Sequence, residues 1–309
     1  MTGVHAAIAA LPRGRWLLAV SGGRDSMVLL DAMASARPGE VAAVATFDHN
    51  TGAAARRASA LVERAGAARA LTVITGTAPS GAPRREAAWR EARHAFLAGW
   101  ARELGATVVT AHTRDDQVET VVQRLLRGAG PRGLAAMRAP RGASVARPFL
   151  GVPRALIAAY ARRRAVPFIE DPSNTDARHQ RNRVRHELLP ALERAHPGFS
   201  EWCWSISGRA AAWRGEAERL VDGLGVTTPA AGTVVVPAGP LRALGRTEWE
   251  VLWPELAARA GVVMDRRGIA RAAAWAPGAR AGGAVQLSGG ASIRRTGATF
   301  VIHGNVGTP

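Results

Sequence analysis

A short polar segment follows the first apolar run of the chain and could bind a phosphate group. Residues 17–20 are apolar, and they lead directly into Ser21, Gly22, Gly23, Arg24, Asp25 and Ser26, after which a helical pattern begins. Glycines let backbone N–H groups approach an anion, and the start of a helix adds its positive dipole end. Serine hydroxyls could donate to phosphate oxygens, and Asp25 could hold Mg²⁺. A plain strand–turn–helix with serine as its cap is the alternative.

A group of ionisable residues lies at the end of a later apolar run. His112 follows this run, and Asp115, Asp116 and Glu119 come shortly after it. The i,i+4 spacing places Asp115 and Glu119 on one helix face. Thr113 followed by Asp116 has the form of a capping box, so the same residues also serve to start a helix. We expect these residues both to start a helix and to take part in the chemistry, because several ionisable groups converge beside the phosphate loop.

Arginine is concentrated in two segments that could contact phosphates. Arg181 and Arg185 share one helix face, where planar guanidinium groups could bind RNA or triphosphate oxygens. A solvated helix face is the alternative. In the earlier segment, Arg90 could pair with Glu86 at i,i+4 spacing or contact phosphate together with Arg93.

Asp48 and His49 end another apolar run. The carboxyl ends of parallel strands are where ligands bind, so both residues are candidates for nucleotide contacts. A histidine at the end of a strand is often structural, and this alternative stays open for His49.

The hexapeptide from Ser21 to Ser26 resembles the PP-loop of the ATP pyrophosphatases, which cleave ATP between its α- and β-phosphates. The resemblance implies an adenine nucleotide alpha-hydrolase-like fold with a central parallel sheet. It also implies that a substrate is adenylated and pyrophosphate is released.

Four further stretches make residues 16–190 similar to the tRNA(Ile)-lysidine synthase family. They are Asp48-His49, residues 86–94, residues 111–128, and the segment from Glu170-Asp171-Pro172-Ser173-Asn174 to Pro190. The resemblance implies conversion of the wobble cytidine of a CAU-anticodon tRNA(Ile) to lysidine, with ATP, Mg²⁺ and free L-lysine. The cytosine C2 oxygen attacks the α-phosphate, pyrophosphate leaves, and the lysine ε-amine then displaces AMP at C2.

The resemblance also suggests roles for individual residues. Asp25, His112, Asp116 and Arg181 would be catalytic, with Asp25 as the metal ligand and Asp116 as the contact for lysine or metal or as general base. The nucleotide would be bound by Ser21, Gly22, Gly23, Arg24, Asp25, Ser26, Asp48 and His49. Lysine and tRNA would be bound by Arg90, Arg93, Asp115, Glu119, Arg127, Asn182, Arg183 and Arg185. Two departures leave nucleotide-side details open: Asn50-Thr51-Gly52 stands where the family usually has Gly-Leu-Arg, and His94 where it commonly has Tyr.

The charge of the chain supports a polyanionic partner. Its 309 residues carry 41 basic and 24 acidic side chains, for a net charge of +17, and every basic one is arginine. A GC-rich genome explains arginine in place of lysine but not the excess of positive charge, which is typical of nucleic-acid binding. The absence of lysine excludes a Walker A loop and a pyridoxal phosphate Schiff base.

The single cysteine limits the alternatives. Cys203 cannot form an intrachain disulfide or a zinc site by itself. A tRNA thiolase usually needs a cysteine pair or an iron–sulfur site to carry sulfur. A single cysteine therefore argues against this class of enzyme, which stays as the main alternative. An NAD or GMP synthetase would not explain the charge, and an inactive nucleic-acid-binding module would not need an intact loop. No apolar run reaches 18 residues and no signal peptide is evident, so we expect a cytoplasmic protein without a membrane partner. A homodimer is left open.

The alternation of strands and helices in the first half predicts an α/β fold. We expect strands at residues 16–20, 41–47, 71–74 and 107–110, with helices beginning near Asp25, Ala53, Glu86 and Asp115. Residues 128–142 should form a mobile surface loop. Pro153 should open a helix, and Pro190 should end one.

Three regions follow from this pattern. Residues 1–195 would form the PP-loop catalytic domain, residues 196–230 a helical linker containing Trp202, Trp204 and Trp213, and residues 231–309 a smaller helical or α+β C-terminal domain. In the last third we expect helices at 247–260 and 266–275, and short strands at 234–236, 285–287, 291–295 and 300–303. Its many arginines indicate tRNA binding, with a folding or dimerisation domain as the alternative.

Overall fold

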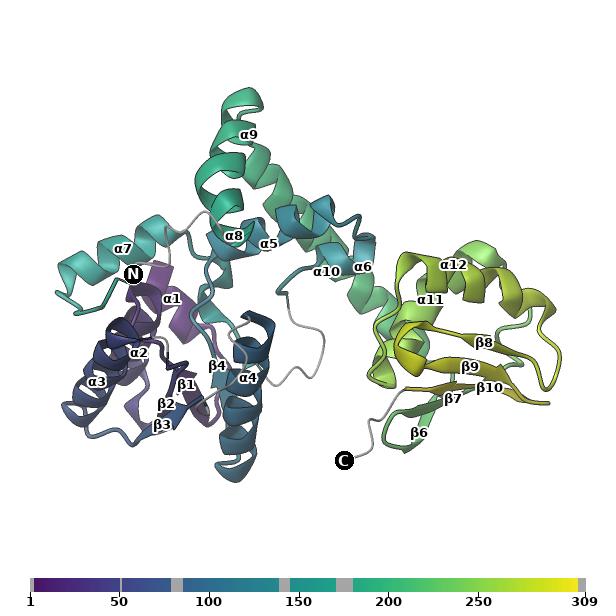
Figure 1. The fold of residues 1–309 in the computed structure, drawn as a ribbon, viewed down its shortest axis with the longest axis horizontal. Helices are drawn as coiled ribbons and strands as arrows, with labels where there is room; N and C mark the ends of the chain where they lie inside the picture. The colour runs from purple at the N-terminus through teal and green to yellow at the C-terminus, as the bar shows by residue number, and fades with distance from the viewer. Residues whose placement is uncertain (1–2, 51, 79–85, 139–144, 171–179, 305–309) are drawn as a thin grey trace. The chain divides into compact units, whose positions relative to one another are not determined.

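The chain forms two compact units. The structure is a computed structural model that describes residues 3–50, 52–78, 86–138, 145–170 and 180–304. One unit comprises residues 1–129 and 133–208, and the other residues 130–132 and 209–309. Helix α10 (Phe199–Asp222) contributes residues to both (Figure 1). Within the described ranges, no helix combines the length and the apolar character needed to cross a membrane.

The first unit is built on a five-stranded parallel sheet of order β3-β2-β1-β4-β5. Its strands are β1 (Trp16–Ala19), β2 (Val41–Asp48), β3 (Val73–Thr77), β4 (Thr107–Val109) and β5 (Val145–Ala146). The chain adds β2 and β3 on one side of β1 and then crosses to add β4 and β5 on the other. The carboxyl ends of β1 and β4 therefore adjoin where the strand order reverses, the usual ligand position in such sheets.

Helices cover both faces of this sheet because successive strand side chains point in opposite directions. Leu18 and Val44 pack on one face against a layer of helices, and Leu17 and Ala43 pack on the other face against α4 (Glu86–Glu103). The helices of the first layer are α1 (Gly3–Ala9), α2 (Arg24–Ala36), α3 (Ala53–Ala67) and α7 (Arg154–Arg163). The predicted parallel sheet with helices on both faces is confirmed.

A separate group of helices surrounds α5 (Arg114–Leu126). Val118, Val121 and Val122 of α5 pack against Val184 and Cys203 in a small core of their own. Later elements that contribute to this core are the π-helix η4 (Val184–Leu188), α9 (Leu189–Ala195) and the first part of α10. Helix α8 (Gln180–Arg183) leads directly into η4, so packing of η4 on α5 also sets the position of α8, and both α5 and α8 carry candidate site residues.

Some predicted elements differ from the structure. Pro190 does not end a helix, because it lies in the first turn of α9 and the helix continues into it from η4. A wider π-turn before a proline removes the clash that its ring would make in a regular α-helix. The predicted loop at 128–142 contains helix α6 (Pro131–Leu134), and residues 139–142 lie outside the described residues. Helix α1 and strand β5 were not predicted, and β3 begins two residues later than expected.

The second unit is an antiparallel sheet with two helices. The strand order is β6-β7-β10-β9-β8. The strands are β6 (Thr227–Ala230), β7 (Thr233–Pro237), β8 (Ala284–Gln286), β9 (Ser292–Arg295) and β10 (Thr299–His303), and the helices are α11 (Arg246–Arg259) and α12 (Arg266–Trp275). Trp249 and Trp253 stack at 4.6 Å between ring centres, and Phe300 packs edge-on to both. The predicted α+β organisation is confirmed.

Candidate active site

The loop after β1 has the backbone geometry of an anion cradle. Gly22 has φ +80°, and a Cβ atom there would lie 2.7 Å from the Cβ of Ala58 and 2.8 Å from its carbonyl oxygen. Only glycine satisfies both the positive φ and this close approach. Gly23 is the N-cap of α2 and provides no side-chain cap, so N–H groups in the first turn of the helix have no capping oxygen from it.

The two serines of the loop lie in different environments. Ser26 is buried, and its hydroxyl donates to the Gly23 carbonyl at 2.9 Å and accepts from the Ser21 backbone N–H at 3.1 Å. Ser21 is exposed, and its Oγ lies 3.2 Å from that of Ser26. Ser26 therefore braces the loop from inside, whereas Ser21 lies at the surface.

Asp25 lies at the start of α2 with about a quarter of its side chain exposed. Its Oδ1 accepts from Arg24 Nε at 3.4 Å, and its Oδ2 lies 3.6 Å from Arg154 Nε. Burial raises the pKa of Asp25 above its usual value, and the charges of Arg154 and Arg24 offset part of this effect. A single partly exposed carboxylate beside a phosphate cradle fits Mg²⁺, which usually combines one or two carboxylates with phosphate oxygens and water.

Asp48 and His49 have mainly structural contacts. The buried Asp48 accepts from the Asn50 backbone N–H at 2.7 Å, and this contact shapes the turn. Asn50 has φ +56°, a region that asparagine and glycine adopt more readily than other residues. The His49 ring packs edge-on against Phe47, with 5.0 Å between the ring centres, and it also contacts Trp89. Burial lowers the pKa of His49, so the ring is uncharged at neutral pH.

His112 follows β4 at the reversal of strand order. Its Nδ1 lies 2.8 Å from the Thr110 hydroxyl. Burial lowers the pKa of His112 to about 4; Asp116 opposes this, while Arg147 and Arg181 add to it. The ring is therefore neutral at pH 7, and a pKa this low makes it a weak base.

Asp116 divides its two oxygens between a helix cap and the site. Its Oδ2 accepts from the Thr113 N–H at 2.7 Å and from the Thr113 hydroxyl at 2.9 Å, which forms the predicted capping box. Its Oδ1 accepts from three guanidinium groups: Arg154 at 2.5 Å, Arg181 at 2.8 Å and Arg185 at 3.2 Å. Burial alone would raise the pKa of Asp116, but Arg154, Arg181 and the bonds from Thr113 hold it below the usual range.

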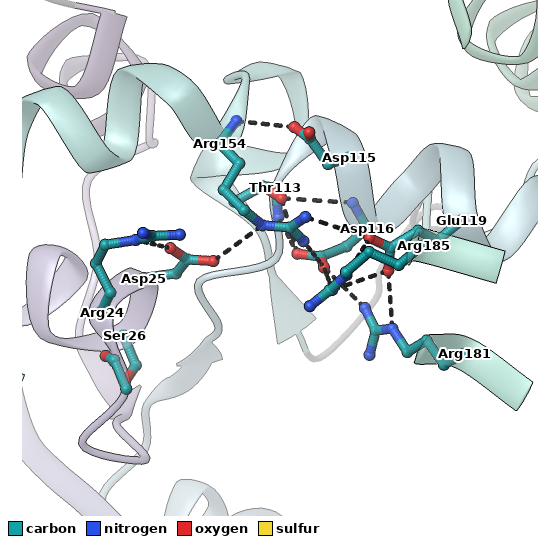
Figure 2. A network of polar contacts seen from close by, with 11 residues as sticks. Arg24, Asp25, Ser26, Thr113, Asp115, Asp116, Glu119, Arg154, Arg181 and Arg185 are labelled. Atoms are coloured by element: carbon teal, nitrogen blue, oxygen red, sulfur yellow. Dashed lines mark hydrogen bonds and ion pairs between the residues drawn. The ribbon is translucent and has the colours of Figure 1, made fainter. Parts of the chain in front are cut away.

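Glu119 completes a carboxylate pair with Asp116, one turn further along α5 (Figure 2). Its side chain is 1% exposed. It accepts from Arg154 at 3.2 Å, from Arg181 at 3.0 Å, and from two nitrogens of Arg185 at 2.6 and 2.9 Å. Three arginines thus converge on two buried carboxylates.

Asp115 does not join this pair. Its Oδ2 accepts from the backbone N–H of Arg154 at 2.8 Å, so it helps to fix the start of α7. A binding role for Asp115 stays a prediction, and the contact that the structure gives its carboxylate is with the backbone of α7. The pair that converges is Asp116 with Glu119, because α5 turns its buried side towards α7 and α8.

The remaining predicted residues lie on α4, at the end of α5 and on α8, or outside the described residues. Arg93 is half-buried on α4, and Arg90 is exposed on the same helix. The side chain of Glu86, the proposed partner of Arg90, lies outside the described residues, as do Asp171, Pro172, Ser173 and Asn174. Arg127 is exposed and donates to Gln180 at 2.6 Å. On α8, Asn182 is buried and Arg183 is exposed.

Sequence analysis missed two arginines of this region. Arg154 contacts Asp25, Asp116 and Glu119, yet no motif spacing marks it; only its place in the first turn after Pro153 could have drawn attention. Arg147 directly follows β5 at the ligand edge of the sheet. Its Nε is buried and has no hydrogen-bond partner within the described part of the chain.

Cys203 has the environment expected of a structural cysteine. It is fully buried in the core around α5. Burial, with a smaller contribution from Glu193, raises the pKa of the thiol to about 11. A thiol of this kind is inert rather than nucleophilic.

Exposed arginines are numerous on the second unit. Arg246 pairs with Glu250 and Arg259 with Asp222. Further exposed arginines form no salt bridge in the ranges that the structure covers, among them Arg209, Arg219, Arg242, Arg266, Arg267, Arg271, Arg280 and Arg294.

Comparison with known proteins shows which sequences and folds this chain is similar to. The PP-loop domain family matches residues 2–192. The tRNA(Ile)-lysidine synthase of Salinispora arenicola is 38% identical, over 97% of this chain and 94% of the relative. That of Ralstonia nicotianae is 40% identical over 74% of this chain, which spans half of that longer relative. Among solved structures, the U34-tRNA thiolase NcsA from Methanococcus maripaludis with its [4Fe-4S] cluster has a TM-score of 0.55 at 12% identity, over 68% of this chain and 77% of NcsA, a likeness of fold alone. With its intact phosphate loop and its match to relatives over nearly its whole length, the chain belongs to the tRNA(Ile)-lysidine synthase family of PP-loop enzymes.

Proposed function

We propose that this chain joins lysine to C2 of the wobble cytidine, position 34, of tRNA(Ile) with a CAU anticodon, with conversion of ATP to AMP and pyrophosphate. The observation that carries the proposal is the array in which Asp25 of the phosphate loop and the Asp116–Glu119 pair are joined by the guanidinium of Arg154. One half of this array suits an adenylation step, and the other half suits capture of an amine.

In the adenylation step, the C2 oxygen of cytidine attacks the α-phosphorus of ATP. The bond from the α-phosphorus to the bridging oxygen breaks, and pyrophosphate leaves with the electron pair. N–H groups of the loop and of the first turn of α2 would bind the phosphates. Asp25 would hold Mg²⁺ together with phosphate oxygens, and this ion would stabilise charge on the leaving group. The lack of a larger acidic or histidine metal cluster among the described residues is compatible with this, since phosphates supply the other ligands.

In the ligation step, the neutral ε-amine of lysine attacks C2 and a C–N bond forms. The bond from C2 to the phosphate oxygen breaks, AMP leaves, and the amine loses a proton. Asp116 and Glu119 would attract and orient the amine. With pKa values this low, Asp116 and the uncharged ring of His112 are both weak bases, and either would pass the proton on to water.

Arginines would supply the contacts to RNA. We infer that Arg181 and Arg185 turn from the carboxylates to phosphates when RNA binds, and that Arg90, Arg93, Arg127 and Arg183 extend this surface. In the region 231–309, the exposed arginines would bind other parts of the tRNA. The catalytic steps would take place in residues 1–195, and the helical part of the predicted linker 196–230 is α10 (Phe199–Asp222), since residues 227–230 form β6.

The test uses purified protein with transcripts of tRNA(Ile) carrying C34 or U34. Labelled lysine should enter only the C34 transcript, and only with ATP, with one AMP released per lysine. Incorporation into the U34 transcript, or entry of labelled sulfur in place of lysine, would contradict the proposal. The thiolase alternative has little support, because the one cysteine of the chain is buried and has a raised pKa.

A further inference from the structure

Arg154 is the one described residue whose side chain contacts both halves of the site. Each of its three guanidinium nitrogens has a different carboxylate partner. Nε lies 3.6 Å from Asp25 Oδ2, Nη2 lies 2.5 Å from Asp116 Oδ1, and Nη1 lies 3.2 Å from Glu119 Oε1. Figure 2 shows this side chain extending between the phosphate loop and α5. The three carboxylates are therefore held around one planar cation.

The position of Arg154 is fixed from the backbone as well. Its N–H donates to Asp115 at 2.8 Å, and the Arg114 N–H donates to Val152 at 3.0 Å, so the start of α7 is tied to the start of α5. Further along α7, Ile157 and Tyr160 are buried in the main core of the unit. Movement of the Arg154 backbone would therefore require movement of α7.

The other two arginines at the carboxylate pair are less constrained. The Arg154 side chain is 19% exposed, whereas those of Arg181 and Arg185 are 41% and 25% exposed. If an ammonium group entered while all three arginines stayed, four cations would face two carboxylates. If Arg181 and Arg185 leave, Arg154 with Asp116 and Glu119 has a net charge of −1, which matches one ammonium group.

We propose that Arg154 is a positioning residue that holds Asp25, Asp116 and Glu119 in one array and so sets the lysine site in register with the adenylation site. This inference rests on the proposed function. Arg154 would act through the carboxylates and not on the reacting atoms. A planar guanidinium directs N–H groups from three separate nitrogens at three spaced acceptors, whereas a lysine side chain offers all its N–H groups from one nitrogen.

The test compares Arg154→Lys and Arg154→Ala with Arg164→Lys and Arg164→Ala. Arg164 is a matched control, because it lies at the end of the same helix and pairs with Asp31, away from the site. Measurements are the KM for lysine, the kcat, the Kd for tRNA and the thermal midpoint. We expect Arg154→Lys to raise the KM for lysine at least about tenfold while leaving tRNA affinity within about twofold. Arg164→Lys should leave the KM for lysine unchanged.

Chemical rescue separates positioning from folding. For Arg154→Ala, low concentrations of guanidinium ion should restore part of the lysine incorporation, and Arg164→Ala should not respond. The inference is overturned if Arg154→Lys has the wild-type KM for lysine, or if Arg154→Ala loses activity only in proportion to its loss of folded protein and guanidinium restores none. If the wild-type enzyme incorporates no lysine, the proposed function itself fails, which is a distinct result.

Discussion

Replacement of Glu119 by glutamine should both destabilise the first unit and weaken lysine binding. The side chain is 1% exposed and accepts four hydrogen bonds of 2.6–3.2 Å from three arginines. The glutamine amide keeps the shape but removes the negative charge. It also places an N–H₂ group against guanidinium groups that can only donate. Asp116 would then be the one carboxylate left that contacts all three arginines.

The expected loss of stability depends on how deeply Glu119 and its arginine partners are buried. Removing one partner of a buried ion pair costs about 3–5 kcal/mol. Arg181 is 41% exposed and can turn into water, which screens part of the loss, so we expect the lower end, about 3 kcal/mol. For a unit of about 200 residues, 1 kcal/mol corresponds to about 2–4 °C, so the midpoint should fall by about 6–12 °C.

Thermal unfolding followed by circular dichroism measures this effect, with Glu201→Gln as the control. The Glu201 side chain is 70% exposed and pairs with Arg114, so its loss should cost about 1 kcal/mol or less. Calorimetric titration with lysine in the presence of tRNA gives the second readout, where only Glu119→Gln should bind more weakly. Equal midpoints for the two variants would refute the reasoning that Glu119 balances the arginine cluster.

Three further perturbations test other parts of the structure. Gly22→Ala would place a Cβ atom 2.7 Å from Ala58 at a residue with positive φ, so the free energy of unfolding measured in urea should fall by about 2–5 kcal/mol. Gly99→Ala, which has open space around it, should not lower this free energy, and equal stability of the two variants would contradict the loop geometry. Arg181→Gln should strengthen lysine binding in the absence of tRNA in calorimetric titration, and an unchanged Kd would argue against competition for the carboxylates. The pKa of Cys203 is raised to about 11 from an unfolded value of 9.0, so the unfolded chain loses the thiol proton first as the pH rises. The contribution of this thiol to the free energy of unfolding is complete below pH 9 and should fall by about 2–3 kcal/mol as the pH rises from 9 to 11. Cys203→Ala should lack this component of the pH dependence, and identical unfolding profiles for the two proteins would disprove it.

Local features of the site could be predicted from the sequence because neighbouring residues determine them. The phosphate loop needs only a strand, a glycine turn and a helix in direct succession. The capping box of Thr113 and Asp116 likewise depends on hydrogen bonds within one turn. The strong resemblance of residues 16–190 to a known family added the identity of the reaction, which no single motif indicates.

Contacts between elements that are distant in sequence could not be predicted, since they depend on how the elements pack. Arg154 is 38 residues from Asp116 in sequence, and the two meet only because α7 and α5 are tied together at their first turns. The same packing places the Asp115 carboxylate against the backbone N–H of Arg154, a contact that sequence spacing does not indicate.

The sequence by itself therefore determined the type of chemistry, and the tertiary structure decided which charges meet. A run of arginines shows that cations are present but not which carboxylates they contact, because a guanidinium side chain is long and can reach in many directions. Burial decides the outcome: Glu119 is almost completely enclosed, so the arginines around it must pair with it, whereas exposed arginines on the same helices remain in water. Burial is a property of the whole fold, and no local spacing specifies it.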